Sequence, residues 1–366
     1  MRPLSRRINI RRITRTHPPL GLALLVLAML AAAACVGFNN PEGWAGPTVA
    51  ADDLLVVSTD KGELSALNAQ DFSIIWTFPT GQEDPEIDLE AIYTTPPVIG
   101  DTVYLGGYSG DVYALSLDDG SVLWSFDADG PIIAGLAASE TAVYAATDKG
   151  ILYALDPQTG RPKVTPFDAG DSIWAAPLLA EGVIYVASVN GKLYALDAET
   201  LDPIWDAPFE AGGGLISDPV LADGAILVGG FDRTLYAVDA ASGEEREGWP
   251  FKADNWFWGR PLVLDETVYA PNLDGLLYAI DLETGEELWS FEAEEPEPLR
   301  SSPVLATDVL VIVDRKGGMY GLNPENGDRV WSAPEALGKT VLSNPIADSP
   351  VLGAEVFISA QGGDLF

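Results

Sequence analysis

Two reactive side chains each occur once in this sequence, a histidine and a cysteine. His17 and Cys35 both lie near the N-terminus. Catalytic triads, imidazole acid-base catalysis and His- or Cys-ligated metal sites need such side chains in the folded region. One cysteine cannot form an internal disulfide, and no Cys-x-x-Cys-His haem attachment motif is present. The sequence therefore excludes most enzyme classes from the region after Cys35 and favours a protein without catalytic activity.

Carboxylates are the remaining groups that could do chemistry, since the chain contains 55 Asp and Glu residues. The segment Asp127-Ala-Asp129-Gly130 has the beginning of a calcium loop, but it lacks the further ligands and the terminal Glu. We interpret it as a solvated turn. Four more aspartates recur directly after strand-like segments and are interpreted as turn residues. They are Asp156, Asp197, Asp239 and Asp281. We predict no catalytic residue, no metal ligand and no cofactor from these carboxylates.

Aromatic side chains and one arginine are the best candidates for a binding surface. Most of them stand three residues before the proline that recurs in the sequence, and Trp256 lies in the segment just before that proline. Aromatic residues and arginine often dominate the energy of protein interfaces. The predicted binding face consists of Trp44, Tyr93, Trp174, Trp256, Trp258 and Arg300, with Ile216 at the same place in one copy. The alternative is that these large side chains only fill the mouth of a central channel.

The elements that must position these residues belong to an internal repeat. A phrase of the type Gly-x-Leu-Tyr-Ala-Leu-Asp recurs eight times, at intervals of about 40 to 48 residues, which is the spacing of four-stranded propeller blades. A proline precedes most copies, and a tryptophan follows most of them at a fixed distance. We interpret these tryptophans as structural: Trp76, Trp124, Trp205, Trp289 and Trp331, with Trp249 displaced by two positions. Asp-Gly, Thr-Gly, Ser-Gly and Asn-Gly pairs mark tight hairpins.

These patterns predict an all-β fold, an eight-bladed β-propeller of four-stranded antiparallel blades. The last blade is expected to be incomplete, because the last copy of the phrase reaches Phe366 before its fourth strand. The prolines mark the start of each unit. Because the strands of a blade alternate in direction, the links between repeats, with the predicted binding residues, are expected to share one face of the propeller with the hairpins between the second and third strands. A ring of blades leaves only short strand edges exposed, which protects an all-β chain from edge-to-edge aggregation.

The repeat resembles a known family. The phrase Leu-Tyr-Ala-Leu-Asp, a turn glycine and then Leu-Trp is similar to the pyrroloquinoline-quinone-like propeller repeat over residues 43–366. That family includes quinoprotein alcohol dehydrogenases and outer-membrane assembly lipoproteins of the BamB type. The dehydrogenases use a catalytic aspartate, calcium or lanthanide ligands and an adjacent cysteine pair, and this chain cannot supply the pair. The resemblance therefore implies the lipoprotein type more than the dehydrogenase type.

The N-terminus has the pattern of a secretory leader. Arginines but no acids precede an apolar run over residues 20–34, which is shorter than the ~20 residues of a membrane-spanning helix. The residues Ala32-Ala33-Ala34-Cys35 resemble the lipobox of bacterial lipoproteins, although that family prefers Leu where Ala32 stands. We predict a signal peptide over residues 1–35 with lipidation at Cys35, a linker over 36–43 and the propeller over 44–366. Cleavage by the ordinary signal peptidase and an uncleaved anchor are the alternatives.

The net charge of −35 limits the partners that the protein can have. Such a surface repels nucleic acid and favours solubility, salt adaptation or a basic partner surface. We predict a monomeric extracytoplasmic scaffold, anchored to the outer membrane or to the outer face of the plasma membrane, that binds an envelope protein. The alternative is a sugar-binding or quinone-binding propeller, including a divergent quinoprotein dehydrogenase with pyrroloquinoline quinone and calcium. A surface sensor or adhesion domain is a third hypothesis.

Overall fold

The computed structural model describes residues 43, 45–50, 54–58, 62–79, 87–93, 95–293, 297–331, 335–349, 353–360 and 364–365. All of them belong to one unit, Glu42–Phe366. The predicted leader with Cys35, and the predicted binding residue Trp44, lie outside the described residues. Among the residues that are described, no helix is long and apolar enough to span a membrane.

The described chain forms seven four-stranded antiparallel sheets, each with its strands in chain order. The first three blades contain β1 (Thr48–Ala50), β2 (Leu54–Ser58), β3 (Leu64–Asn68) and β4 (Ile74–Phe78); β5 (Val98–Ile99), β6 (Thr102–Gly106), β7 (Asp111–Ser116) and β8 (Val122–Asp127); and β9 (Leu136–Ala138), β10 (Val143–Ala146), β11 (Ile151–Leu155) and β12 (Phe167–Asp168). The fourth and fifth contain β13 (Leu178–Ala180), β14 (Val183–Ala187), β15 (Lys192–Asp197) and β16 (Phe209–Glu210); and β17 (Val220–Ala222), β18 (Ala225–Gly229), β19 (Thr234–Asp239) and β20 (Phe251–Lys252).

The sixth and seventh blades have the same order of strands. They contain β21 (Leu262–Leu264), β22 (Thr267–Pro271), β23 (Leu276–Asp281) and β24 (Glu287–Glu292); and β25 (Val304–Ala306), β26 (Val309–Val313), β27 (Gly318–Leu322) and β28 (Glu335–Ala336). The last repeat gives two two-stranded ladders, which we call the partial sheet. It contains β29 (Ile346–Ser349), β30 (Gly353–Phe357), β31 (Ser359–Ala360) and β32 (Asp364–Leu365).

The prediction of an all-β propeller with four-stranded antiparallel blades is confirmed, but the prediction of eight blades is wrong. The structure has seven four-stranded blades. In the eighth repeat β29 pairs with β30 and β31 pairs with β32, and the described residues of this repeat form these two separate ladders instead of one four-stranded sheet. The physical reason is that the strand formed by the last copy of the phrase, β32, has only two described residues, whereas the third strands of the seven blades have five or six and pair on both sides.

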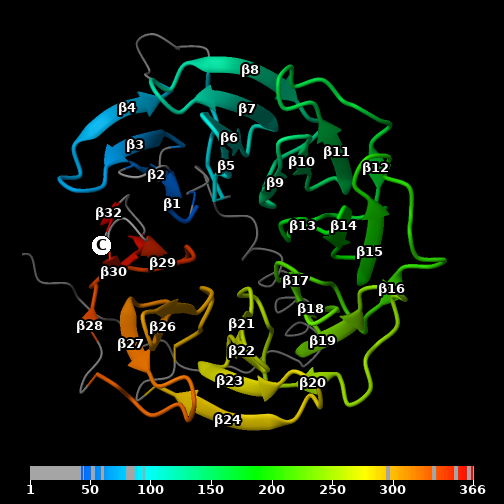
Figure 1. Ribbon diagram of the computed structural model, residues 1–366, viewed down its shortest axis with the longest axis vertical. Coiled ribbons are helices and arrows are strands. Elements are labelled where there is room, and N and C mark those ends of the chain that lie inside the picture. Colours follow the sequence, from blue (N-terminus) through cyan, green and yellow to red (C-terminus); the bar gives the residue numbers. More distant parts are fainter. Residues whose placement is uncertain are drawn as a thin grey trace, which may run out of the picture. The chain divides into compact units, whose positions relative to one another are not determined.

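The hydrophobic core is a series of clusters between neighbouring sheets, which lie around a common centre (Figure 1). Val56 of β2 and Leu105 of β6, for example, belong to one cluster of the first two blades. The partial sheet closes the series. Its Ile346 packs against the cluster that includes Leu55 of the first blade, and its Ile358 is buried with Val313 of the seventh blade.

The structural tryptophans connect one blade to the next. The indole nitrogen Nε1 of Trp76 donates to the carbonyl of Leu117, Trp124 donates to Pro157, and Trp205 donates to Ala240, at 2.8, 2.8 and 3.1 Å. Each acceptor lies in the turn after the third strand of the following blade. These bonds fix neighbouring blades in a constant register, because a buried indole N–H that lost its acceptor would cost free energy.

Where the tryptophan is displaced, the blades still make the same contact. Trp249 of the fifth blade donates from Nε1 to the carbonyl of Leu282 at 3.2 Å. The shift of two residues therefore lengthens the preceding turn without removing the connection between the fifth and sixth blades.

Candidate functional site

The predicted binding residues lie on the links between repeats, and a repeated hydrogen bond holds these links in place. In six consecutive repeats a backbone N–H of the hairpin between the second and third strands, the central hairpin, donates to a link carbonyl. The distances are 2.8 to 3.1 Å. The pairs are Tyr108–Ala91, Asp148–Pro131, Val189–Ser172, Phe231–Gly214, Leu273–Trp256 and Arg315–Pro298. The links are therefore ordered backbone even though they form no strands.

The two residues that follow each of these carbonyls have different environments. The first is buried among the sheets with at most 1% of its surface exposed: Ile92, Ile132, Ile173, Leu215, Phe257 and Leu299. The second we call the ring residue: Tyr93, Ile133, Trp174, Ile216, Trp258 and Arg300. The buried side chain anchors each link in the core directly beside its ring residue.

Sequence reasoning found all of the ring residues except Ile133. The rule that located them counts back from a proline, and Leu136 stands where that proline would be in the third repeat. Ile216 was included, but only 4% of its surface is exposed, so it belongs to the packed interior. The binding role of the others stays a prediction.

Three of the predicted tryptophans gather around one phenylalanine. The ring centroid of Phe231 lies 5.9 Å from that of Trp174, 4.7 Å from that of Trp256 and 6.3 Å from that of Trp258, in edge-to-face arrangements. We call Trp174, Phe231, Trp256 and Trp258 the aromatic cluster. Edge-to-face pairs are stabilised by about 0.5–1.5 kcal/mol beyond the burial of their area. The cluster is therefore a fixed surface rather than four independent side chains.

Phe231 was missed by sequence reasoning. It lies in the central hairpin of the fifth blade, five residues before the repeat tyrosine Tyr236. The same position is occupied by Tyr108 in the second blade, where its ring is 5.5 Å from that of Tyr93. A comparison of the central hairpins, rather than of the links alone, would have found this second row of residues.

Hydrogen bonds hold the tryptophans of the cluster in position. Trp174 donates from Nε1 to the carboxylate of Asp148 at 2.8 Å. The backbone N–H of Trp256 donates to the side chain of Asn255, and Asn255 itself donates to the carbonyl of Leu273, at 2.9 and 3.2 Å. Trp256 nevertheless keeps 40% of its surface exposed. An ordered, exposed indole loses little conformational entropy when it binds.

Arg300 extends this surface toward the seventh blade. Its guanidinium carbon Cζ lies 4.4 Å from the ring centroid of Trp258, within the range of a cation–π contact. Burial, and next the positive charge of Arg315, lower the pKa of Arg300 to about 10, whereas Tyr93 acts in the opposite direction. Trp258 and Arg300, which come from two different links, are thus brought into contact by the structure.

The carboxylates that were interpreted as turn residues accept hydrogen bonds in turns. Asp156 accepts from the backbone N–H and the hydroxyl of Thr159, at 2.8 and 2.9 Å, and these bonds keep its pKa below the ordinary value. Asp281 is bound in the same way by Thr284. Asp129 forms an ion pair with Lys149 at 2.5 Å. In the part of the chain that the structure describes, no three His, Cys, Asp or Glu side chains gather as ligands of one metal ion.

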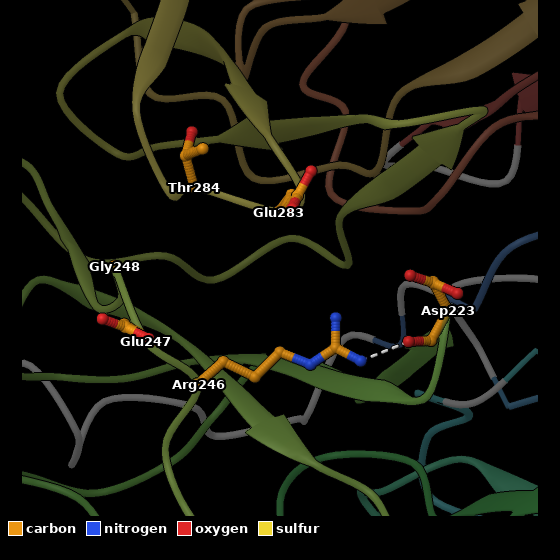
Figure 2. A pocket seen from close by; sticks show the side chains of 6 residues that line it. All are labelled: Asp223, Arg246, Glu247, Gly248, Glu283 and Thr284. Atoms are coloured by element: carbon orange, nitrogen blue, oxygen red, sulfur yellow. Dashed lines mark hydrogen bonds between the residues drawn. The ribbon is translucent and has the colours of Figure 1, made fainter.

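A hollow of about 470 Å³ lies between the fifth and sixth blades and is lined by none of the residues of the aromatic cluster. Figure 2 shows Arg246 extending across it to the backbone carbonyl of Asp223, with Glu283 and Thr284 on the other side. Glu247 and Gly248, in the turn that Trp249's displacement lengthens, complete its lining. Four of its six lining residues are charged and none is aromatic, so it offers less apolar area to a partner than the aromatic cluster.

Known proteins share this architecture. The crystal structure of BamB from Moraxella catarrhalis superposes with a TM-score of 0.72 at 18% identity, covering 88% of this chain and 92% of that one. A quinohemoprotein alcohol dehydrogenase from Pseudomonas putida gives 0.69 at 14% identity, covering 89% and 71%. At such identities these likenesses show the fold alone.

Sequence comparison finds relatives of the BamB kind. Outer membrane protein assembly factor BamB of Alkalilimnicola ehrlichii is 33% identical over 122 residues, which is 32% of this chain and 31% of the relative. The chain thus aligns with about a third of the length of the curated relatives. The family described as outer membrane protein assembly factor BamB matches residues 32–161, 108–208, 166–246 and 203–365. Since these matches cover most of the sequence, the chain belongs to the BamB family of pyrroloquinoline-quinone-like propellers.

Proposed function

We propose that this propeller is a membrane-anchored, extracytoplasmic scaffold in outer-membrane protein assembly, and that it holds a protein partner on its aromatic cluster. The observation that carries the proposal is the convergence of three tryptophans on Phe231, on the face formed by links and central hairpins. The relatives named as outer membrane protein assembly factors support the process. Lipidation at Cys35 would supply the anchor.

The physical chemistry of the aromatic cluster suits a protein partner. Trp256 offers a large apolar area with a polar N–H, and its backbone is already fixed by Asn255. Arg300, stacked on Trp258, adds a cation at the edge of the apolar area. Tryptophan and arginine on a rigid frame are the residues that most often dominate binding energy.

The test is the capture of envelope proteins by the immobilised full chain and by the variant Trp256→Ala. Truncating a hot-spot tryptophan costs about 2 kcal/mol or more of binding free energy, so affinity should fall by about 30-fold. The matched control is Leu288→Ala on the outer strand β24, since Leu288 is also a large exposed apolar side chain, with 53% of its surface exposed.

Two results are decisive. Envelope proteins that bind the wild type and the Leu288 variant, but not the Trp256 variant, would support the scaffold. If the wild type and the Trp256 variant capture the same proteins with the same affinity while both melt at the same temperature, the proposed binding surface is wrong.

A further inference from the structure

The outer strand of the first blade differs from the outer strands of the other six. β4 lies on the rim of the ring, with β3 on one side and no described strand on the other (Figure 1). It has five residues, and none of them is charged. Each of the other six outer strands, β8, β12, β16, β20, β24 and β28, contains at least one Asp, Glu or Lys. Charged residues on an edge strand prevent pairing with another chain, and β4 lacks this protection.

The exposed side chains of β4 are apolar as well. Ile74 and Ile75 have 67% and 49% of their surface exposed, whereas Trp76 and Phe78 are buried in the cluster of the first two blades. An edge strand offers backbone N–H and C=O groups at a regular spacing, and an extended chain can bond to several of them in register. The edge and its apolar side chains therefore favour an extended segment as the occupant over a helix.

Three exposed carboxylates border β4 and indicate the charge of that segment. Asp71 lies in the turn just before the strand. Asp118 and Asp119 lie in the turn of the second blade whose Leu117 carbonyl accepts the indole N–H of Trp76 at 2.8 Å. In the part of the chain that the structure describes, none of these three acids belongs to an ion pair. Basic side chains on the segment would therefore meet complementary charge.

The same charges disfavour two other occupants of this edge. A second copy of the chain would bring acidic residues against acidic residues. An anionic membrane surface would be repelled by a protein with a net charge of −35. The remaining occupant is a different protein with a basic, apolar segment.

We propose that β4 binds an extended segment of another protein, which adds a fifth strand to the first blade and carries Lys or Arg beside its apolar residues. Backbone hydrogen bonds supply the affinity, and contacts with Ile74 and Ile75 supply the preference for apolar side chains. None of the residues of the aromatic cluster belongs to this edge. The inference therefore goes beyond the proposed function and does not depend on it.

The probe is a synthetic peptide, Lys-Lys-Val-Thr-Val-Thr-Val-Lys-Lys, added to the full-length protein. Hydrogen exchange of the backbone amides, followed by mass spectrometry, reports which strand it protects. We expect exchange over residues 74–78 to slow by at least about tenfold at saturating peptide, and exchange over residues 287–292 of β24 to stay unchanged. A peptide with proline at the central valine loses a backbone donor, and one with glutamate for every lysine is repelled, so neither should protect β4.

A charge placed on β4 supplies the protection that this edge lacks. Ile75→Lys should weaken peptide binding by at least about tenfold. Leu288→Lys is the matched control, since Leu288 stands directly before Trp289 as Ile75 stands before Trp76, and 53% of its surface is exposed. This control and Trp256→Ala should both bind the peptide like the wild type, which separates this test from that of the aromatic cluster.

Four results would overturn the inference. The edge site is wrong if the peptide leaves residues 74–78 unprotected, or if Ile75→Lys binds it as tightly as the wild type does. Protection of β4 that rises with protein concentration alone, together with a dimer in sedimentation, would assign the edge to a second copy. Protection by phosphatidylglycerol vesicles without peptide would assign it to a lipid surface. In each case the capture test with Trp256→Ala still decides the scaffold separately.

Discussion

Tyrosine hydroxyl groups stabilise the blades from inside by donating to carbonyls and carboxylates. Tyr144 donates to the carbonyl of Ala198 at 2.6 Å, and Tyr278 donates to the carboxylate of Asp274 at 2.8 Å. Burial raises the pKa of both tyrosines, and for Tyr278 the bond to Asp274 raises it further. The phenol must stay protonated to donate, so these bonds depend on pH.

The sign of this dependence follows from the direction of the shift. A tyrosine whose pKa is raised in the folded state contributes its full stability below the unfolded pKa of about 10, and this contribution is lost as the pH rises above it. We therefore expect the free energy of unfolding to fall between pH 9 and pH 12. Tyr278→Phe should show a smaller fall than the wild type in urea titrations at these pH values. An identical fall in both proteins would contradict the assignment.

At the scale of the element, the turn after the third strand is fitted to the tryptophan of the preceding blade in the second, third, fifth, sixth and seventh blades. Gly160 has a φ of 68°, and a Cβ placed on it would lie 2.5 Å from Cε3 of Trp124. Gly120 meets Trp76 in the same way. Glycine is required there both by the left-handed backbone and by the indole that packs on it.

We expect Gly160→Ala to lower the free energy of unfolding by about 2–4 kcal/mol, of which about 1 kcal/mol is backbone strain and the rest is the displaced indole. Gly182→Ala is the matched control. Gly182 has a φ of 79°, but no atom lies within 4 Å of an added Cβ, so only the strain applies. Chemical denaturation measures the loss of free energy of unfolding in each variant. Equal losses in Gly160→Ala and Gly182→Ala would show that the indole contact has no energetic role.

The elements themselves could be predicted from the sequence, whereas their contacts across blades could not. The second strand of the fourth blade, β14 (Val183–Ala187), can be recognised in the sequence, because its apolar residues and its flanking turns are local signals. The meeting of Trp174 with Phe231 joins the link before the fourth blade to the central hairpin of the fifth. No local pattern encodes that distance, since it depends on how neighbouring sheets are turned relative to each other.

At the scale of the whole molecule, the ring is completed by a sheet that is not a blade. The repeat count predicted eight blades with the last one incomplete, and the structure instead has seven blades and a partial sheet that packs on both neighbours. Ile358 of the partial sheet keeps only 1% of its surface exposed, against Val313 and Val341. Closure of the ring therefore depends on a few side chains of the partial sheet that contact the first and the seventh blade.

We expect Ile358→Ala to lower the free energy of unfolding of the entire propeller by about 2–4 kcal/mol, as for other buried aliphatic truncations. Val330→Ala, in the turn region before the last strand of the seventh blade, removes an apolar side chain that is 52% exposed and should cost less than about 0.5 kcal/mol. Calorimetry of both variants measures this difference. If the Ile358 variant unfolds like the wild type, the partial sheet does not close the ring.

The hydrogen bond between each central hairpin and its link has a consequence for how such a face diversifies. Six links are held by the same backbone bond and the same buried anchor, while the ring residue beside the anchor is Tyr, Ile, Trp, Ile, Trp or Arg. Ile216 packs in the interior, but the backbone bonds and buried anchors do not use the other five ring side chains, so each of these five positions can be exchanged without loss of the link. Repeated duplication of one unit thereby gives five positions on one rigid face at which a single substitution changes the binding surface.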